Sequence, residues 1–211
     1  MSNKLQLYLL RHAESQANLT HSFASQKLNL PLTEYGIEQS KQIAQKLKTI
    51  NFEAIYSSPL LRAIETAEII SINYNLTPII SDLLREIDVG ELDGKSINDI
   101  KIKQQYQQII EQWQAGKHNI SFVGGESLMK VKERILEFLC LVEKNNYSKI
   151  LVVGHGLFFM AFIWLFCDNH GLNYESGRIN RCHYSVVENK NGRYNIIEHD
   201  IAPENSIKGK Y

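Results

Sequence analysis

Five side chains with the chemistry of phosphoryl transfer follow short apolar stretches of the sequence. They are two arginines, two histidines and one glutamate: Arg11, His12, Arg62, Glu86 and His155. Two guanidinium groups can bind the oxygens of a phosphomonoester dianion through paired, charge-assisted hydrogen bonds. A neutral imidazole is a competent nucleophile toward phosphorus, and a carboxylic acid can protonate a leaving alcohol. The set therefore suits phosphomonoester chemistry, provided that the fold brings the five groups together.

Each of these residues has a more ordinary interpretation when it is taken alone. The pair Arg11-His12 could be surface polarity, Arg62 a solvated helix residue, and Glu86 a partner of its neighbour Arg85. The glycines on both sides of His155 permit a close approach of the backbone to a ligand, which favours a functional interpretation. The joint pattern along the chain carries the hypothesis, and each residue adds to it.

The elements that must position these residues alternate between strands and helices. Apolar runs long enough for strands and too short for helices occupy residues 5–10, 54–56, 78–80 and 150–153. Helical patterns occupy residues 33–50, 59–71, 95–114, 128–142 and 157–167, and a terminal hairpin is predicted for 184–188 and 194–198. This order predicts a three-layer α/β domain with a mostly parallel central sheet flanked by helices. Ligands of such sheets bind beyond the carboxyl ends of the strands, where the five side chains would meet.

Two helix starts carry specific expectations. Thr33 is the predicted N-cap of a helix whose inward face includes Ile37 and Ala44. Ser58 is the predicted N-cap of the following helix, with Pro59 at its first position. Arg62 would then lie on the first turn and lean back toward the sheet edge.

The chain is interpreted as a single domain, residues 1–211, with a helical cap insertion at residues 95–127. Three aromatic residues of this insertion, Tyr106, Trp113 and Phe122, could face a substrate. Anchoring the cap to the domain is the favoured interpretation. Three lysines of the same region, Lys101, Lys103 and Lys117, could meet a second anionic group, although a solvated face is the commoner role.

Composition excludes several classes of protein. The 211 residues include 23 basic and 23 acidic side chains, so no net charge draws the chain to nucleic acid or to a membrane surface. The longest apolar run, Leu157–Cys167, falls far short of the roughly 20 residues of a membrane span, and the N-terminal apolar stretch is too short for a signal peptide. Three cysteines without paired spacing predict reduced thiols and a cytoplasmic location. No metal-ligand spacing is present, so no metal or other cofactor is expected.

Several ordered motifs resemble those of the histidine phosphatase superfamily, the phosphoglycerate-mutase-like proteins. The opening motif is Leu9-Leu10-Arg11-His12-Ala13-Glu14-Ser15, followed by Asn18. The others are Leu32-Thr33-x-x-Gly36-x-x-Gln39, Tyr56-Ser57-Ser58-Pro59-Leu60-x-Arg62-Ala63, Leu84-x-Glu86-x-x-x-Gly90, and the pair Gly124-Gly125-Glu126-Ser127 and Val152-Val153-Gly154-His155-Gly156. The match covers roughly residues 5–160.

The resemblance implies a role for each matched residue. His12 would be the phosphorylated nucleophile and Glu86 the proton donor. Arg11, Arg62 and His155 would form the phosphate pocket. Further phosphate or substrate contacts would come from Ser15, Asn18 and Gly156. The resemblance implies no metal.

The resemblance is compatible with three functions: two different enzymes and a binding module without activity. Glu86 is followed by Ile87-Asp88-Val89-Gly90, apolar and acidic rather than basic, which favours a phosphatase over a bisphosphoglycerate-dependent phosphoglycerate mutase. A catalytically silent phosphate-binding module is the third possibility. The sequence leaves open which small phosphomonoester is the substrate, and whether the apolar run 157–167 and the hairpin pair two copies in a homodimer. Ala13 replaces the commoner glycine, and a positive φ there would cost about 1 kcal/mol.

Overall fold

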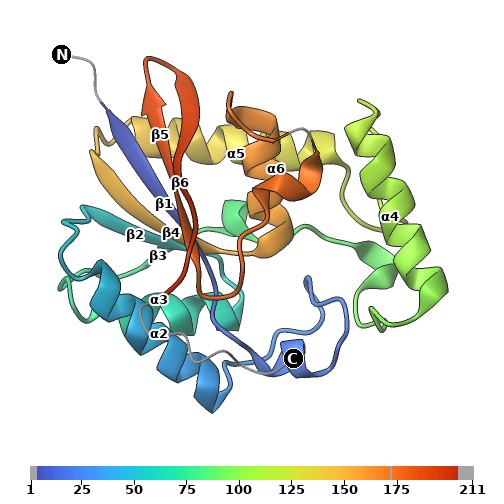
Figure 1. Cartoon of the computed structure of the whole chain (residues 1–211), viewed down its shortest axis with the longest axis horizontal. Helices are drawn as coiled ribbons and strands as arrows, with labels where there is room; N and C mark the ends of the chain where they lie inside the picture. The colour runs from blue at the N-terminus through green and yellow to red at the C-terminus, as the bar shows by residue number, and fades with distance from the viewer. Residues whose placement is uncertain (1–3, 172, 204–211) are drawn as a thin grey trace.

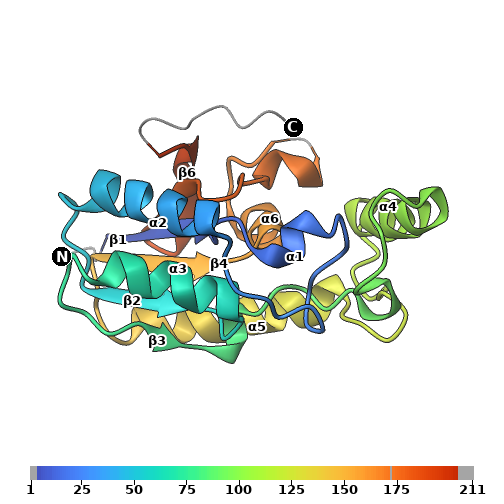
Figure 2. The same ribbon diagram turned by 90° about the horizontal axis from the view of Figure 1, so that it is seen from below.

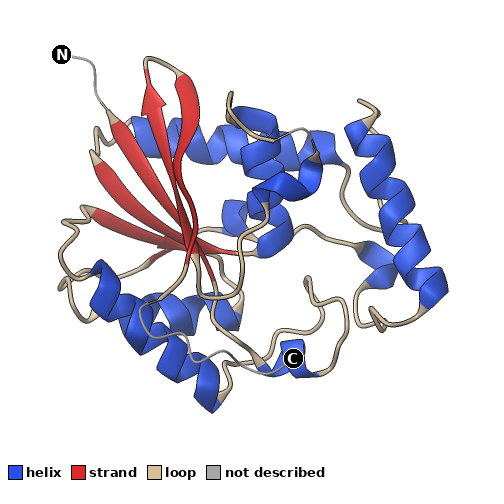
Figure 3. Cartoon of the chain, in the orientation of Figure 1, coloured by secondary structure: helices blue, strands red, loops and turns tan. Residues whose placement is uncertain are grey.

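The computed structural model describes residues 4–171 and 173–203, and its centre is a six-stranded sheet (Figure 3). The strands are β1 (Leu5–Arg11), β2 (Ala54–Ser57), β3 (Ile79–Ile80), β4 (Lys149–Gly154), β5 (Tyr184–Lys190) and β6 (Arg193–Ile201). Their order in the sheet is β3-β2-β4-β1-β5-β6. The first four are parallel, and β5 and β6 join them as an antiparallel hairpin. The predicted α/β class and the mostly parallel sheet are confirmed.

Helices cover both faces of the sheet. The α-helices are α1 (Gln16–Leu19), α2 (Glu34–Leu47), α3 (Leu61–Ser71), α4 (Ile100–Gln114), α5 (Leu128–Glu143) and α6 (Gly156–Phe166). Three 3-10 turns, η1 (Asp82–Leu84), η2 (Gly90–Leu92) and η3 (Tyr174–Gly177), lie in the connections. Helices α2 and α3 pack on one face and α5 and α6 on the other, as the two orthogonal views show (Figures 1 and 2).

The alternation of side chains along the central strands explains the two cores. Leu7 and Leu9 of β1 join the core under α5 and α6, whereas Tyr8 and Leu10 join the core under α2 and α3. Successive residues of a strand point to opposite faces, so a strand that is apolar throughout must be covered on both sides. The apolar runs of the sequence are therefore the signature of the buried layer.

The strand register places the two histidines of the sequence motifs side by side. Arg11 at the end of β1 pairs with Gly154 at the end of β4. The next residues, His12 and His155, therefore leave the sheet together at its carboxyl edge. The N–H of His12 donates to the carbonyl of Gly154 over 2.9 Å, which fixes the backbone at this point.

The first long helix begins as predicted but faces the core differently. Thr33 is its N-cap, and the Thr33 hydroxyl accepts a hydrogen bond from the N–H of Gly36 over 2.9 Å. Ile37, however, is 38% exposed, so its predicted inward position is wrong. Gly36 occupies the inward face instead, where an added Cβ would come within 1.9 Å of the carbonyl oxygen of Glu14. The close contact of two backbones, which needs a glycine, sets the rotation of this helix.

Helix α4 stands apart from the sheet, beyond α6 (Figure 1). Trp113 is fully buried, and its indole N–H donates to the carbonyl of Ile120 over 2.7 Å. Ile100, at the first turn of the helix, is 73% exposed, so it does not anchor the helix to the core. Among residues 4–171 and 173–203, no helix combines the length and apolarity needed to cross a membrane.

Candidate active site

A cavity of about 540 Å³ opens at the carboxyl edge of the sheet. Its lining includes six of the residues that the sequence singled out: Arg11, His12, Asn18, Arg62, Glu86 and Gly156. His155 is fully buried next to it, with its ring centroid 5.2 Å from that of His12. The structure thus brings together residues that lie up to 145 positions apart, which is the difference between 156 and 11.

The ring of His12 is held with one nitrogen directed toward the cavity arginine. Its Nδ1 lies 2.7 Å from the carbonyl oxygen of Ala13, which can only accept, so Nδ1 carries the proton. The Nε of Arg62 donates to His12 Nε2 over 3.2 Å. Burial and the Arg62 and Arg11 guanidiniums lower the pKa of His12 well below its ordinary value of 6.5. At neutral pH the ring is therefore neutral, with its lone pair on Nε2.

Arg62 is buried on the first turn of α3, only 1% exposed. Its Nη2 donates to the carbonyl of Ala24 over 2.9 Å, and its Nη1 donates to that of Leu28 over 3.3 Å. Backbone carbonyls thus take the outer N–H groups and fix the plane of the guanidinium. Its Nε is directed at His12.

Asp93 holds the loop that supplies those carbonyls. Its carboxylate accepts hydrogen bonds from the backbone N–H groups of Ser25, Gln26 and Lys27 over 3.0, 2.7 and 2.7 Å, and from the Ser25 hydroxyl over 2.8 Å. These hydrogen bonds lower the pKa of Asp93 below 3.8 although burial opposes them. Asp93 therefore positions Arg62 indirectly, through the loop.

His155 forms a hydrogen bond with Ser58, which the sequence predicted to be a helix N-cap. Its Nε2 lies 2.7 Å from the hydroxyl oxygen of Ser58. The prediction of Ser58 as an N-cap with Pro59 in the first turn is wrong, since the helix begins at Leu61 with Leu60 as N-cap. Burial, with Arg62 as the next cause, lowers the pKa of His155 well below 6.5. His155 Nδ1 is buried and has no hydrogen-bond partner among the described residues.

Arg11 lies against the start of α6. Its Nη1 donates to the carbonyl of Ile179 over 3.0 Å, and its Nε is buried without a partner in the described part of the chain. Burial lowers the pKa of Arg11 to about 10, so the guanidinium stays charged at neutral pH. A Cβ added to Gly156 would come within 2.9 Å of the guanidinium carbon of Arg11. Glycine is thus needed here for the approach of the arginine.

The carboxyl group of Glu86 accepts hydrogen bonds from the start of α6. Its Oε1 accepts from the N–H of Phe158 over 2.9 Å, and its Oε2 accepts from that of Leu157 over 3.2 Å. Burial raises the pKa of Glu86 above 4.5, while the N–H groups of Ile87, Leu157 and Phe158 and the charge of Arg62 lower it. Two of the N–H groups that follow His155 are thus bound to Glu86, and neither is left for a phosphate.

A further arginine, Arg134, supports the backbone around Glu86. The Nη1 of Arg134 donates to the carbonyls of Leu83 and Arg85, over 2.8 and 3.1 Å. The same guanidinium forms a two-point ion pair with Glu126, at 2.9 Å for each contact. Arg134 was not predicted from the sequence, because a charged residue on an amphipathic helix has the pattern of a solvated one.

Asn18 and Ser15 occupy different environments. Asn18 lines the cavity, and its Oδ1 accepts hydrogen bonds from the N–H and hydroxyl of Ser15 over 2.9 and 3.1 Å. This leaves the Nδ2 donors of Asn18 for other acceptors. Ser15 is fully buried outside the cavity lining, so its position fits support of Asn18 rather than direct contact with a substrate.

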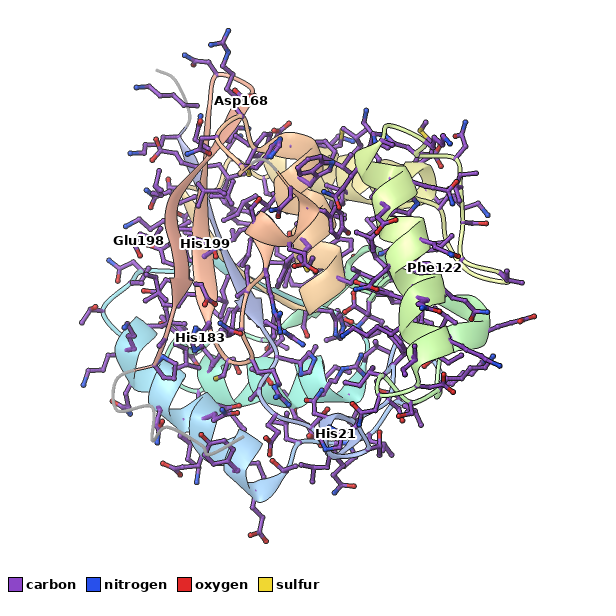
Figure 4. All side chains as sticks on the ribbon, turned by 45° about the vertical axis from the view of Figure 1, so that its right-hand side comes forward. His21, Phe122, Asp168, His183, Glu198 and His199 are labelled. Atoms are coloured by element: carbon purple, nitrogen blue, oxygen red, sulfur yellow. The ribbon has the colours of Figure 1, made fainter. Side chains whose placement is uncertain are left out.

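The residues of the predicted cap insertion differ in their position relative to the cavity. Tyr106 lines the cavity, whereas Trp113 and Phe122 are buried in the core and anchor the region, as expected. Phe122 is labelled in Figure 4. None of the three cap lysines, Lys101, Lys103 and Lys117, is part of the lining. Besides Arg11 and Arg62, the arginines of the lining are Arg178 and Arg181.

Two further observations concern residues outside the motifs. His21, on the loop after α1, lines the cavity (Figure 4) and had no signal beyond its residue type. Glu198 and His199 lie on the terminal hairpin, away from the α4 side (Figure 4). Within the described ranges, His, Cys, Asp and Glu side chains form no group of three or more that could hold a metal ion.

Comparison with known proteins identifies the family. The model of the histidine phosphatase superfamily (branch 1) matches residues 7–201, so the chain belongs to this superfamily. The resemblance inferred from the ordered motifs is confirmed, and the named relatives support an enzyme of the histidine phosphatase type.

Individual relatives are similar over most of the chain. Phosphoserine phosphatase 1 of Hydrogenobacter thermophilus is 32% identical over 202 residues, covering 94% of this chain and 93% of that protein. A protein of Proteus mirabilis named probable phosphoglycerate mutase GpmB is 31% identical over 159 residues, covering 72% and 70%. The crystal structure of the α-ribazole phosphatase of Shigella flexneri superposes with a TM-score of 0.73 at 24% identity, covering 95% and 100%, which shows the shared fold.

Proposed function

We propose that the chain hydrolyses small phosphomonoesters through a covalent phosphohistidine on His12. The lone pair on Nε2 of a neutral ring, beside the guanidinium of Arg62, supports this role for His12. In the first step Nε2 attacks phosphorus and the bond from phosphorus to the ester oxygen breaks. In the second step water attacks the phosphohistidine, and inorganic phosphate leaves.

Arg11, Arg62 and His155 would bind the phosphate oxygens, with the Nδ2 of Asn18 and the N–H of Gly156 as further donors. Positioned donors of this kind stabilise the charge that develops on the transferred group. Glu86, in its protonated form, would give its proton to the leaving alcohol and then take one from the attacking water. The raised pKa of Glu86 favours the acid form that this role needs.

The single observation that carries the proposal is the pair of buried polar atoms without a partner. In the part of the chain that the structure describes, these are Arg11 Nε and His155 Nδ1, and both belong to residues of this site. A buried polar atom without a hydrogen bond costs about 1–3 kcal/mol. Phosphate oxygens at the cavity floor would give each atom a partner.

The test is chemical trapping of the intermediate. Rapid quenching with a ³²P-labelled phosphomonoester should leave label on His12, and His12→Ala should lose more than about 10⁴-fold in phosphate release. His199→Ala, on the hairpin outside the cavity lining, is the matched control and should keep wild-type activity. Turnover by His12→Ala near the wild-type rate would contradict the proposal.

The second candidate is a phosphoglycerate mutase, favoured by the name of the Proteus mirabilis relative. A mutase returns the phosphoryl group to a bound intermediate, whereas a phosphatase passes it to water. Interconversion of 3-phosphoglycerate and 2-phosphoglycerate without release of inorganic phosphate would reverse the preference. The acidic and apolar residues after Glu86 support the phosphatase.

Several features of the wider molecule belong to the same proposal. Residues 95–127 would act as a cap within a single domain, since Tyr106 of α4 lines the cavity. Three free cysteines, Cys140, Cys167 and Cys182, support a reducing, cytoplasmic setting. Catalysis would need no metal, so EDTA should leave phosphate release unchanged. A homodimer through α6 has little support, because most of that helix is buried within its own chain.

A further inference from the structure

The cavity has a second group of charged residues at its rim, separate from the phosphate-handling group. Residues 174–182, the rim segment, contribute Glu175, Arg178, Asn180 and Arg181 to the lining. Glu175 and Arg178 are exposed, and Arg181 is half-buried. The reaction proposed above uses none of these side chains, although they share its cavity.

The rim segment is fastened to the end of β1. Tyr174 and Ile179 are fully buried, and the carbonyl of Ile179 accepts the hydrogen bond from Arg11. The N–H of Cys182 lies 3.1 Å from the carbonyl oxygen of Arg11 and 3.2 Å from that of His12. The charged side chains are therefore carried on a backbone that contacts both cavity residues of β1.

The two rim arginines have no side-chain partner among the residues that the structure describes. Neither Arg178 nor Arg181 makes a side-chain hydrogen bond or an ion pair with any residue that the structure describes. Both of their charges lower the pKa of Arg11, as expected for cations close to it. Placing unpaired cations near Arg11 costs repulsion, which an anion bound among them would relieve.

Asn180 has a different position in the rim segment. Its backbone N–H and its Nδ2 donate to the two carboxylate oxygens of Asp200, over 2.7 and 2.6 Å. Its side chain is thus engaged in holding the segment to β6. The rim guanidiniums are the groups that remain for a ligand.

We propose that Arg178 and Arg181 bind a carboxylate on the organic part of the substrate, so that the preferred substrates are phosphomonoesters of small carboxylic acids. This rests on the proposed phosphatase activity and names its substrate class. Guanidinium groups bind carboxylates in forked, charge-assisted hydrogen bonds. Glu175 in the same rim leaves two positive charges against one negative, which suits a carboxylate monoanion better than a second phosphate dianion.

The test compares substrates that differ only in the carboxylate. One pair is 3-phosphoglycerate and glycerol 3-phosphate, and the other is phosphoserine and phosphoethanolamine. The wild-type protein should prefer the carboxylate-bearing member of each pair by about tenfold or more in kcat/KM, mostly through KM. In the double variant Arg178→Gln/Arg181→Gln, both preferences should fall to about threefold or less.

Arg193→Gln is the matched control. Arg193 is an exposed arginine at the hairpin turn, at the opposite end of the strands from the cavity, and its substitution should keep both preferences. Thermal unfolding of each variant should show wild-type midpoints. A wild-type ratio near one in both pairs, or a ratio kept in the double variant, would overturn the proposal.

Calorimetry separates the two levels of the proposal. On a His12→Ala background, which should not turn over substrate, phosphoserine should bind about tenfold tighter than phosphoethanolamine, and the rim substitutions should remove the difference. If the wild-type protein released phosphate from none of the four compounds, the phosphatase proposal would fail, and binding would still test the rim. Phosphate release from all four without a carboxylate preference would reject the rim subsite alone.

Discussion

The floor and the rim of the cavity are built in opposite ways. At the floor, His12, Arg62 and His155 are buried, and each is held by at least one hydrogen bond within the chain. At the rim, Arg178 is exposed and Arg181 half-buried, and neither side chain has a partner among the described residues. The floor is thus held by contacts within the chain, whereas no hydrogen bond or ion pair among the described residues holds the rim guanidiniums.

This difference separates rate from selectivity. Groups that stabilise a transition state must be held in place in advance, because reorganising them during the reaction would cost free energy. Groups that choose between substrates need only a difference in binding between one substrate and another. Substitutions at the floor should therefore slow every phosphomonoester, and substitutions at the rim should change only the ranking.

After the loss expected for His12→Ala, Glu86→Gln should have the largest effect on activity. The amide cannot donate a proton as an acid does, so kcat/KM for an alkyl phosphate should fall about 10²–10⁴-fold. With p-nitrophenyl phosphate the loss should be much smaller, since that leaving group needs little protonation. Steady-state kinetics with both substrates checks this, with Glu137→Gln on the exposed face of α5 as control. Equal losses on both substrates would remove the proton-donor role.

The same variant has a defined pH signature. Wild-type kcat/KM should rise as His12 loses its proton, at a pH well below 6.5, because burial and two guanidiniums lower that pKa. It should fall as Glu86 ionises, at a pH above 4.5, because burial raises that pKa. Glu86→Gln should remove the basic limb and keep the acid limb. A basic limb that persists in the variant would belong to another group.

Asp93→Asn should have an intermediate effect on activity. Asp93 is not itself a floor residue, and it acts on Arg62 through the loop that it holds. The amide can accept at one atom only, and its N–H₂ group would face backbone donors of the 25–27 loop. We expect about tenfold lower kcat/KM for all substrates alike, together with about 1–3 kcal/mol lower free energy of unfolding. A change in substrate ranking would contradict the separation of floor and rim. Asp168→Asn, exposed and outside the cavity lining, is the control.

The stability part of this prediction depends on pH. The pKa of Asp93 is lowered in the folded state, so its stabilising contribution is fully present above 3.8, the ordinary value. It is lost as the pH falls through the lower folded-state value. Urea unfolding should therefore show a gap between wild type and variant at pH 7 that closes in acid.

Ala13→Gly should have the smallest effect. Ala13 is not among the residues with positive φ, so the strain considered from the sequence is absent. Its N–H donates to the Thr66 hydroxyl over 3.2 Å in an ordinary conformation. We expect little change in kcat/KM and a loss of about 0.5–1 kcal/mol in stability from added chain entropy. A clear gain in activity would show that the methyl group disturbs the floor.

Sequence patterns predicted the layers and the floor because both follow from strand order. Apolar runs followed by polar residues predicted that Arg11, His12 and His155 lie where strands end. Because β1 and β4 are parallel, these ends meet at one edge of the sheet. The family motifs assigned the chemistry. These predictions needed no knowledge of side-chain packing.

What the sequence missed depends on contacts between distant segments. Ser58 before Pro59 has the local pattern of a helix cap, yet its hydroxyl is bound to His155, 97 residues away. Asp93 and Arg134 form hydrogen bonds with backbone atoms of other loops. Every residue has such backbone atoms, so the sequence does not indicate which of them a side chain will contact. The prediction that Ile37 faces inward on α2 was wrong, because the backbone contact at Gly36 sets the rotation of this helix.

The anchoring of the rim segment at Ile179 and Cys182 has a practical consequence for protein engineering. Between these points and Tyr174, the buried residues fix the course of the chain, while the exposed positions 175 and 178 and the half-buried position 181 are free to vary. A library of variants at these three positions alone could redirect the enzyme to phosphomonoesters with neutral or cationic tails, while leaving the catalytic apparatus as it stands.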